Sequence, residues 1–163
     1  MYTQFCARLS KISLQVAVVG LIAIILCVLY QVFGRYVLND TPTWAETLSL
    51  LLVLYVTMLG TAVGVRDAGH IGLESFLVLA PESLRLKLEL LIHALLIVFG
   101  GCMAYFGVTL AIGQWGQTIP TLPWAPDGLR YLPISLCGGL MVLFSIEHII
   151  ALFKGTEVEP SWH

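Results

Sequence analysis

The chain has 163 residues, of which 58% are apolar and 11% charged, and its formal net charge is −2. An ordinary soluble domain is about 45–50% apolar and about 25% charged, so this composition excludes a water-soluble fold and predicts an integral membrane protein. A chain without a basic excess is a poor candidate for a nucleic-acid partner. Its length predicts one unit, residues 1–163, with no separate soluble domain.

Four apolar stretches are long enough to cross about 30 Å of hydrocarbon at about 1.5 Å per residue. The predicted fold class is all-α and integral to the membrane, with spans at about residues 12–34, 47–65, 88–113 and 132–153. The apolar run of the first stretch is longer than the about 7–15 residues typical of a secretory signal. We therefore expect it to remain as a transmembrane helix.

The distribution of positive charge predicts the orientation. Four spans place both termini on one side, and six Lys and Arg residues lie on that side against two on the other. Because cytoplasmic loops are enriched in Lys and Arg, this excess predicts cytoplasmic termini. Trp44, Trp115 and Trp124 then fall on the outer side, as in an interfacial aromatic belt.

The segments between the spans carry their own signals. Thr43 and Glu46 have the T-x-x-E spacing of a capping box, which predicts the start of the second helix. Residues 70–80 are too short to cross and predict an amphipathic interfacial segment on the cytoplasmic face. Pro81 favours a helix start there, and four prolines in residues 114–133 predict a stiff, extended outer connection.

Small residues line one face of the second helix at helical spacing: Thr57, Gly60, Thr61 and Gly64. Without side-chain bulk, another helix can approach such a face closely. The third helix repeats the pattern with Gly100, Ala104 and Gly107. Each face could dock a partner or pack within this chain's own bundle, and the sequence does not separate these alternatives.

Ionisable residues inside the predicted spans are candidate functional residues, because such groups are costly in a membrane. His93 and Glu147 lie at similar depths near the cytoplasmic side by the helical rise. A pair between them, or a hydrogen bond from His148, would neutralise the carboxylate and hold two helices together. The outer half of every span lacks such groups, so we expect no transport pathway through this chain alone.

The remaining charges lie at helix ends. Arg35 closes the first helix and Glu46 opens the second, where their signs suit the helix dipoles, and the two could also pair. Arg66, Asp67 and His70 lie at the inner end of the second helix. These residues are predicted to set topology, with contact to a partner as the alternative.

Several motifs together resemble one family. Residues 33–39 (FGRYVLN), 44–46 (WAE), 64–71 (GVRDAGHI) and the last helix, with its Ile146-Glu147-His148, are similar to the small membrane subunit of the tripartite ATP-independent periplasmic (TRAP) transporters, the DctQ-type or Q subunit. Thr47 departs from the pattern, because many members carry a second acid there. The resemblance implies structural or interface roles for the matching positions: Arg35, Trp44, Glu46, Arg66 and His70.

The resemblance also implies a function. A non-catalytic small subunit of this kind would act as a fixed scaffold, without cofactor or metal, for a large multi-span membrane subunit. In the family that large subunit holds the substrate and sodium sites and moves substrate by an elevator motion. A periplasmic binding protein would deliver an organic acid, such as a dicarboxylate or sialic acid. Such a complex would lie in lipid in the bacterial inner membrane.

Two other functions are compatible with the residues. A haem b-binding membrane anchor of a redox complex could use His93 and His148 as axial ligands. A small self-assembling exporter would need a charge within a span to bind cationic drugs. Glu147 is a poor candidate for that charge, because it lies near the membrane surface. The four cysteines are scattered without metal-ligand spacing.

Overall fold

A computed structural model of the chain describes residues 2–40, 42–67 and 82–154. Four helices account for most of these residues: α1 (Tyr2–Phe33), α2 (Thr43–Asp67), α4 (Glu82–Gly113) and α5 (Leu132–Lys154). All four are long and apolar enough to cross a membrane, which confirms the predicted all-α membrane fold with four spans. The predicted interfacial segment at residues 70–80 lies outside the described residues.

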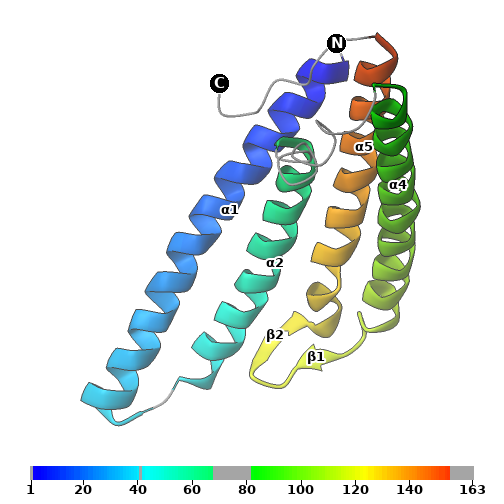
Figure 1. Ribbon diagram of the computed structural model, residues 1–163. Coiled ribbons are helices and arrows are strands. Elements are labelled where there is room, and N and C mark those ends of the chain that lie inside the picture. The colour runs from blue at the N-terminus through cyan, green and yellow to red at the C-terminus, as the bar shows by residue number, and fades with distance from the viewer. Residues whose placement is uncertain (1, 41, 68–81, 155–163) are drawn as a thin grey trace.

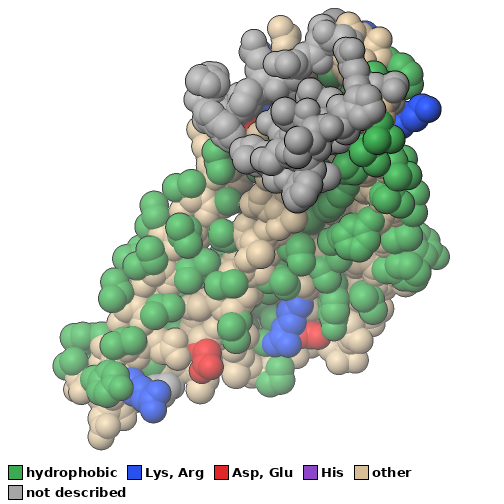
Figure 2. All heavy atoms as spheres, viewed as in Figure 1, with side chains coloured by type: hydrophobic (Ala, Val, Ile, Leu, Met, Phe, Trp, Pro, Cys, Tyr) green, Lys and Arg blue, Asp and Glu red, His purple; other side chains and the backbone are tan. Residues whose placement is uncertain are grey.

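The helices lie side by side in a row rather than in a closed bundle (Figure 1). α1 packs on α2, α2 packs on α5, and α5 packs on α4. The start of α1 and the end of α5 lie at the same end of the molecule. Hydrophobic side chains cover the visible surfaces of α1 and α4 (Figure 2), as expected where a row of helices faces lipid or a partner.

α4 and α5 approach each other closely because glycines face each other. A Cβ added at Gly100 would lie 2.9 Å from the carbonyl oxygen of Gly138, and one at Gly138 would lie 2.6 Å from the amide nitrogen of Ala104. About two helical turns after Gly100 in α4, Gly107 lies against the backbone of Ser135. The small-residue face of the third span is therefore used inside this chain.

The turn between α1 and α2 is tight. α1 continues into a π-helix, Gly34–Leu38, and Asn39 ends it in the left-handed conformation with φ 54°. Asp40 N then donates to the carbonyl of Gly34 at 3.1 Å. α2 begins at Thr43, as predicted, but the capping box is absent: Ala45 N bonds the carbonyl of Pro42, and the described hydrogen bonds include none from Glu46 to the helix backbone.

The connection between α4 and α5 contains more secondary structure than the predicted extended loop. It forms an antiparallel hairpin of β1 (Thr118–Ile119) and β2 (Leu122–Pro126), followed by a 3-10 helix, Asp127–Arg130. The buried side chains of the hairpin pack against α2 and the 3-10 helix: Ile119, Leu122 and Ala125, with Leu48 and Leu129. The predicted extended connection corresponds only to the two strands, because Asp127–Arg130 are helical and Pro133 lies in the first turn of α5. The hairpin packs against Leu48 of α2, a contact that is distant in sequence and that a local pattern does not predict.

Candidate functional site

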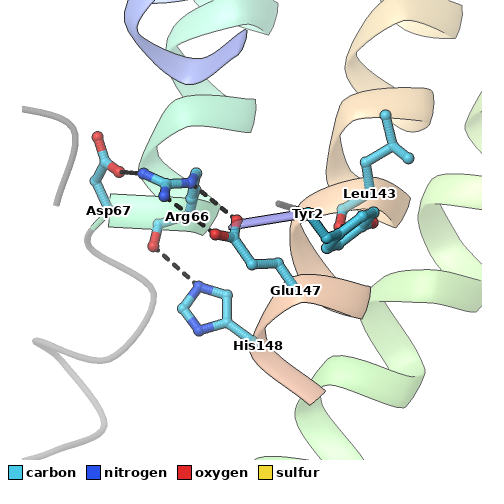
Figure 3. Close-up of polar contacts among 6 residues, drawn as sticks. All are labelled: Tyr2, Arg66, Asp67, Leu143, Glu147 and His148. Atoms are coloured by element: carbon cyan, nitrogen blue, oxygen red, sulfur yellow. Dashed lines mark hydrogen bonds and ion pairs between the residues drawn. The ribbon is translucent and has the colours of Figure 1, made fainter. Parts of the chain in front are cut away.

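A buried ion pair joins α2 to α5 near the end where α1 begins (Figure 3). The guanidinium of Arg66 donates through Nε to Glu147 Oε2 at 2.9 Å and through Nη2 to Oε1 at 3.1 Å. The two side chains are 1% and 2% exposed. Arg66 Nη1 also donates to Asp67 Oδ1 at 2.9 Å. This bidentate geometry is the strong form of an arginine–carboxylate contact, and it occupies both oxygens of Glu147.

Two histidines extend this ion pair toward α4. His148 Nε2 lies 2.9 Å from the backbone carbonyl oxygen of Arg66, and since a carbonyl oxygen can only accept, Nε2 is the donor. The ring of His93 stacks on that of His148, with centroids 4.7 Å apart and planes 8° from parallel. The polar cluster, defined here as Arg66, Asp67, His93, Glu147 and His148, therefore connects three helices.

The first turn of α1 closes the same region. Tyr2 donates its hydroxyl to the carbonyl oxygen of Leu143 at 3.0 Å, as Figure 3 shows. Cys6 is fully buried and packs in a core cluster with Ala62 and Phe144. All four helices thus meet around the polar cluster, which therefore holds them together at one end of the row. Across the described residues, no group of three or more His, Cys, Asp and Glu side chains could hold a metal ion.

For Glu147 the sequence left two partners open, His93 and His148, and the structure gives Glu147 a third, Arg66. His93 contacts the cluster through His148. The sequence did contain a signal for the pair of Glu147 with Arg66. Arg66 and Glu147 have opposite charges and lie near the ends of two spans that finish on the same side of the membrane. The position of Arg66 at a helix end predicts instead that it sets the topology of the chain. In the structure Arg66 is buried, with 3% of its surface exposed. His70, predicted to act beside it, lies outside the described residues.

The two histidines do not have the arrangement of a haem site. Axial ligands approach an iron from opposite faces of the macrocycle, whereas His93 and His148 stack face to face at 4.7 Å. No haem fits between rings at that separation. The geometry therefore gives no support to the haem-anchor alternative.

The charges at the opposite end of α1 and α2 are exposed. Arg35 lies in the π-helix and Glu46 in the first turn of α2, and the pair that they could form is absent from the ion pairs of the described residues. Trp44 is 43% exposed and tilts against Tyr30, with ring centroids 5.6 Å apart. These motif residues face outward from the chain instead of supporting its core.

The small-residue face of α2 is open. Thr57, Gly60 and Thr61 are exposed, and a Cβ added at Gly60 or Gly64 would meet no atom of the described residues within 4 Å. Thr57 and Thr61 donate their hydroxyls to the carbonyls of Val53 and Thr57 at 2.7 and 2.8 Å. Among the described residues, no helix of this chain packs on this face, so docking of a partner stays the alternative that we develop below.

Comparison with known proteins places the chain among membrane transporters. The family model for the DctQ component of the tripartite ATP-independent periplasmic transporters matches residues 24–155. Over 142 residues the chain is 30% identical to the sialic acid TRAP transporter small permease protein SiaQ of Vibrio cholerae, covering 86% of this chain and 81% of that protein.

Two further relatives are longer than this chain. The C4-dicarboxylate TRAP transporter small permease protein DctQ of Vibrio cholerae is 30% identical over 112 residues, which cover 63% of this chain and 45% of that protein. The sialic acid TRAP transporter permease protein SiaT of Haemophilus influenzae is 32% identical over 87 residues, which cover 53% of this chain and 14% of that protein. Together with the family match, these similarities show that the chain belongs to the DctQ-component family of the tripartite ATP-independent periplasmic transporters.

Proposed function

We propose that this chain is the small permease subunit of a TRAP transporter and braces a large multi-span permease subunit in the bacterial inner membrane. The large subunit would carry the sodium-coupled movement of an organic acid, delivered by a periplasmic binding protein. The names of the relatives support an organic acid, because sialic acid and C4-dicarboxylates are both carboxylates.

The observation that carries the scaffold role is the placement of polar groups. In the four described helices, the buried charged side chains belong to the polar cluster at one end, and Arg66 holds both oxygens of Glu147. A transport pathway needs accessible polar groups through the membrane midplane. Since the cluster is closed and lies at one end, it suits a rigid brace that carries no substrate.

The likeness to SiaT supports a large permease as the partner. The similar segment is 14% of that protein, so a region of this type belongs to the same chain as a much longer permease segment. We infer that the separate small subunit docks on an equivalent large subunit. The docking face would be the open stripe of α2, where a transmembrane helix could pack closely against Gly60 and Gly64.

The exposed stripe of α2 continues to the opposite end of the helix. Leu50 and Val53 are 65% and 44% exposed, and together with Thr57 and Gly60 they repeat at the spacing of one helical face. Glu46 lies on the same line and is exposed. We therefore propose that Glu46, with the nearby Arg35 and Trp44, contacts the partner where the helices leave the hydrocarbon.

Co-purification of the two subunits tests the docking face. Gly60→Leu fills the open stripe and should reduce recovery of the large permease with the tagged chain in mild detergent, while the chain still inserts into the membrane. Gly101→Leu on α4 is the matched control, because that glycine is also exposed and meets no described atom within 4 Å. Equal recovery from both variants would remove the α2 stripe from the interface.

A further inference from the structure

The hairpin of β1 and β2 carries an exposed tryptophan on a fixed support. Trp124 is 71% exposed, whereas its strand neighbours Leu122 and Ala125 are 2% and 0% exposed. The hydroxyls of Thr121 and Thr47 lie 2.7 Å apart and tie the hairpin to α2. Asp127 N donates to the carbonyl of Gln117 at 2.7 Å and closes its base. The hairpin therefore holds the Trp124 ring outward instead of burying it.

A second tryptophan projects beside the hairpin. Trp115 follows α4 and is 51% exposed. Part of its ring lies against Gly128, where an added Cβ would come within 2.9 Å of Trp115 Cε3. That close approach fixes one edge of the ring on the 3-10 helix and leaves the rest uncovered by the described residues. Trp115 and Trp124 are thus two exposed aromatic side chains at this end of the molecule, and we refer to them together as its aromatic surface.

The depth of this surface follows from α2. Glu46 and Arg66 are the charges that flank its uncharged segment, and at about 1.5 Å per residue they lie about 30 Å apart, the thickness of the hydrocarbon core. Thr47, which contacts the hairpin, is adjacent to Glu46. The hairpin therefore lies at the boundary between hydrocarbon and headgroups, opposite the polar cluster (Figure 1).

The composition of the hairpin suits that boundary. Residues 114–126 contain no charged side chain, and the first charges that follow are Asp127 and Arg130, which pair at 3.2 Å. A connection exposed to bulk water would be expected to carry more charge. Tryptophan concentrates at membrane interfaces because its ring is apolar and its N–H needs a polar partner.

We propose that the β1–β2 hairpin is a membrane-interface anchor that places Trp124 and Trp115 among the headgroups and glycerol carbonyls of the adjacent leaflet. The occupant of this surface is lipid and not a protein. Because interfacial aromatic side chains fix the depth and tilt of transmembrane segments, the anchor holds the α4–α5 pair at a set depth. This role requires only that the chain spans the membrane, and is independent of the substrate of the transporter.

A spin label at position 124 distinguishes lipid from water and protein. Cys27→Ala and Cys102→Ala remove the two cysteines that are not buried, while Cys6 and Cys137 remain. Trp124→Cys is then labelled with a nitroxide in phosphatidylcholine–phosphatidylglycerol vesicles. Val98→Cys and Lys154→Cys give the references for hydrocarbon and for water, because Val98 is 65% exposed within α4 and Lys154 ends α5.

Collisions with oxygen report exposure to lipid, and collisions with a water-soluble nickel complex report exposure to water. The label at 124 should collide more with oxygen than with the nickel complex, at a depth between the two references, both for the chain alone and after co-purification with the large permease. A label as open to nickel as the one at 154 would overturn the anchor. So would a label closed to both reagents, in either preparation, because that result means burial against protein.

Discussion

At the scale of single residues, the polar cluster explains how an arginine and a glutamate are tolerated within apolar helices. Transfer of either charge by itself from water into the protein interior would cost on the order of several kcal/mol of free energy. In the structure Arg66 donates to both Glu147 and Asp67, and Glu147 accepts two bonds from one guanidinium. The pair therefore fixes the register between α2 and α5, because sliding either helix would separate the two groups.

Removal of the Glu147 charge should destabilise the chain. Loss of one partner of a buried ion pair typically costs about 3–5 kcal/mol, and Asp67 remains to offset part of it. Glu147→Gln should therefore lower the free energy of unfolding by about 3 kcal/mol, measured by thermal unfolding in detergent. Uptake by the assembled transporter should stay largely intact below the melting temperature, because the pair is structural.

An exposed ion pair in the same chain provides the control. Arg130 and Asp127 pair at 3.2 Å with side chains 47% and 21% exposed, so Asp127→Asn should cost less than about 1 kcal/mol. Equal melting of the Glu147→Gln variant and the unmodified chain would show that the cluster does not stabilise the fold. Normal melting and assembly with lost uptake would instead assign Glu147 a direct role in transport.

The residues of this cluster were found from the sequence, but not their pairing. Glu147 and His93 were candidates because ionisable groups in apolar spans are costly. Arg66 was a candidate as a charge at a helix end and as a motif residue. Depth along each helix follows from the rise per residue, so the shared depth of Glu147 and His93 was predictable. Which neighbour lies beside Glu147 depends on the order of helices in the row, and hydrophobicity does not encode that order.

At the scale of elements, α2 and α4 carry similar small-residue stripes with different uses. The stripe of α4 is occupied because α5 presents Gly138 and Ser135 to it, whereas the stripe of α2 is open. The four helices were predictable from apolar length, since each exceeds the hydrocarbon thickness. The use of each stripe was not, because that requires knowing which helix lies opposite.

The close approach of α4 and α5 should be sensitive to one methyl group. Gly138→Ala would place a Cβ against the carbonyl oxygen of Gly100 and 2.6 Å from Ala104 N, so we expect a loss of about 1–3 kcal/mol in unfolding free energy. Gly139→Ala, one residue along, meets no described atom within 4 Å and should be neutral or slightly stabilising, since alanine favours a helix. The measurement is thermal unfolding of the two variants under the same conditions. Equal melting temperatures would show that the contact between α4 and α5 at Gly138 is not tightly packed.

At the scale of the whole molecule, the row arrangement leaves much apolar surface uncovered by the chain itself. Large side chains of α1 and α4 are exposed, among them Val19 at 66% and Phe106 at 60%. A soluble monomer rarely exposes such a surface, so lipid or a partner must cover it. Such exposed side chains on the outermost helices of the row suit a brace that lies between a larger permease and the bilayer.

The orientation of the row in the membrane stays a prediction from the distribution of positive charge. Arg66 forms a buried ion pair with Glu147, so its charge contributes little to the orientation of the chain in the membrane. Five Lys and Arg residues then remain on the side of the termini, against Arg35 and Arg130 on the other. The bias still favours cytoplasmic termini, because Lys and Arg are retained on the cytoplasmic side.

Labelling of single cysteines in spheroplasts tests this orientation. In the background that lacks Cys27 and Cys102, Arg130→Cys should react with a membrane-impermeant maleimide in intact spheroplasts, because Arg130 lies in the outer connection and its side chain is 47% exposed. Lys154→Cys should react only after permeabilisation. The reverse pattern would place the termini outside and the polar cluster at the periplasmic interface, and the surplus of five cations over two would then have failed as a topology signal.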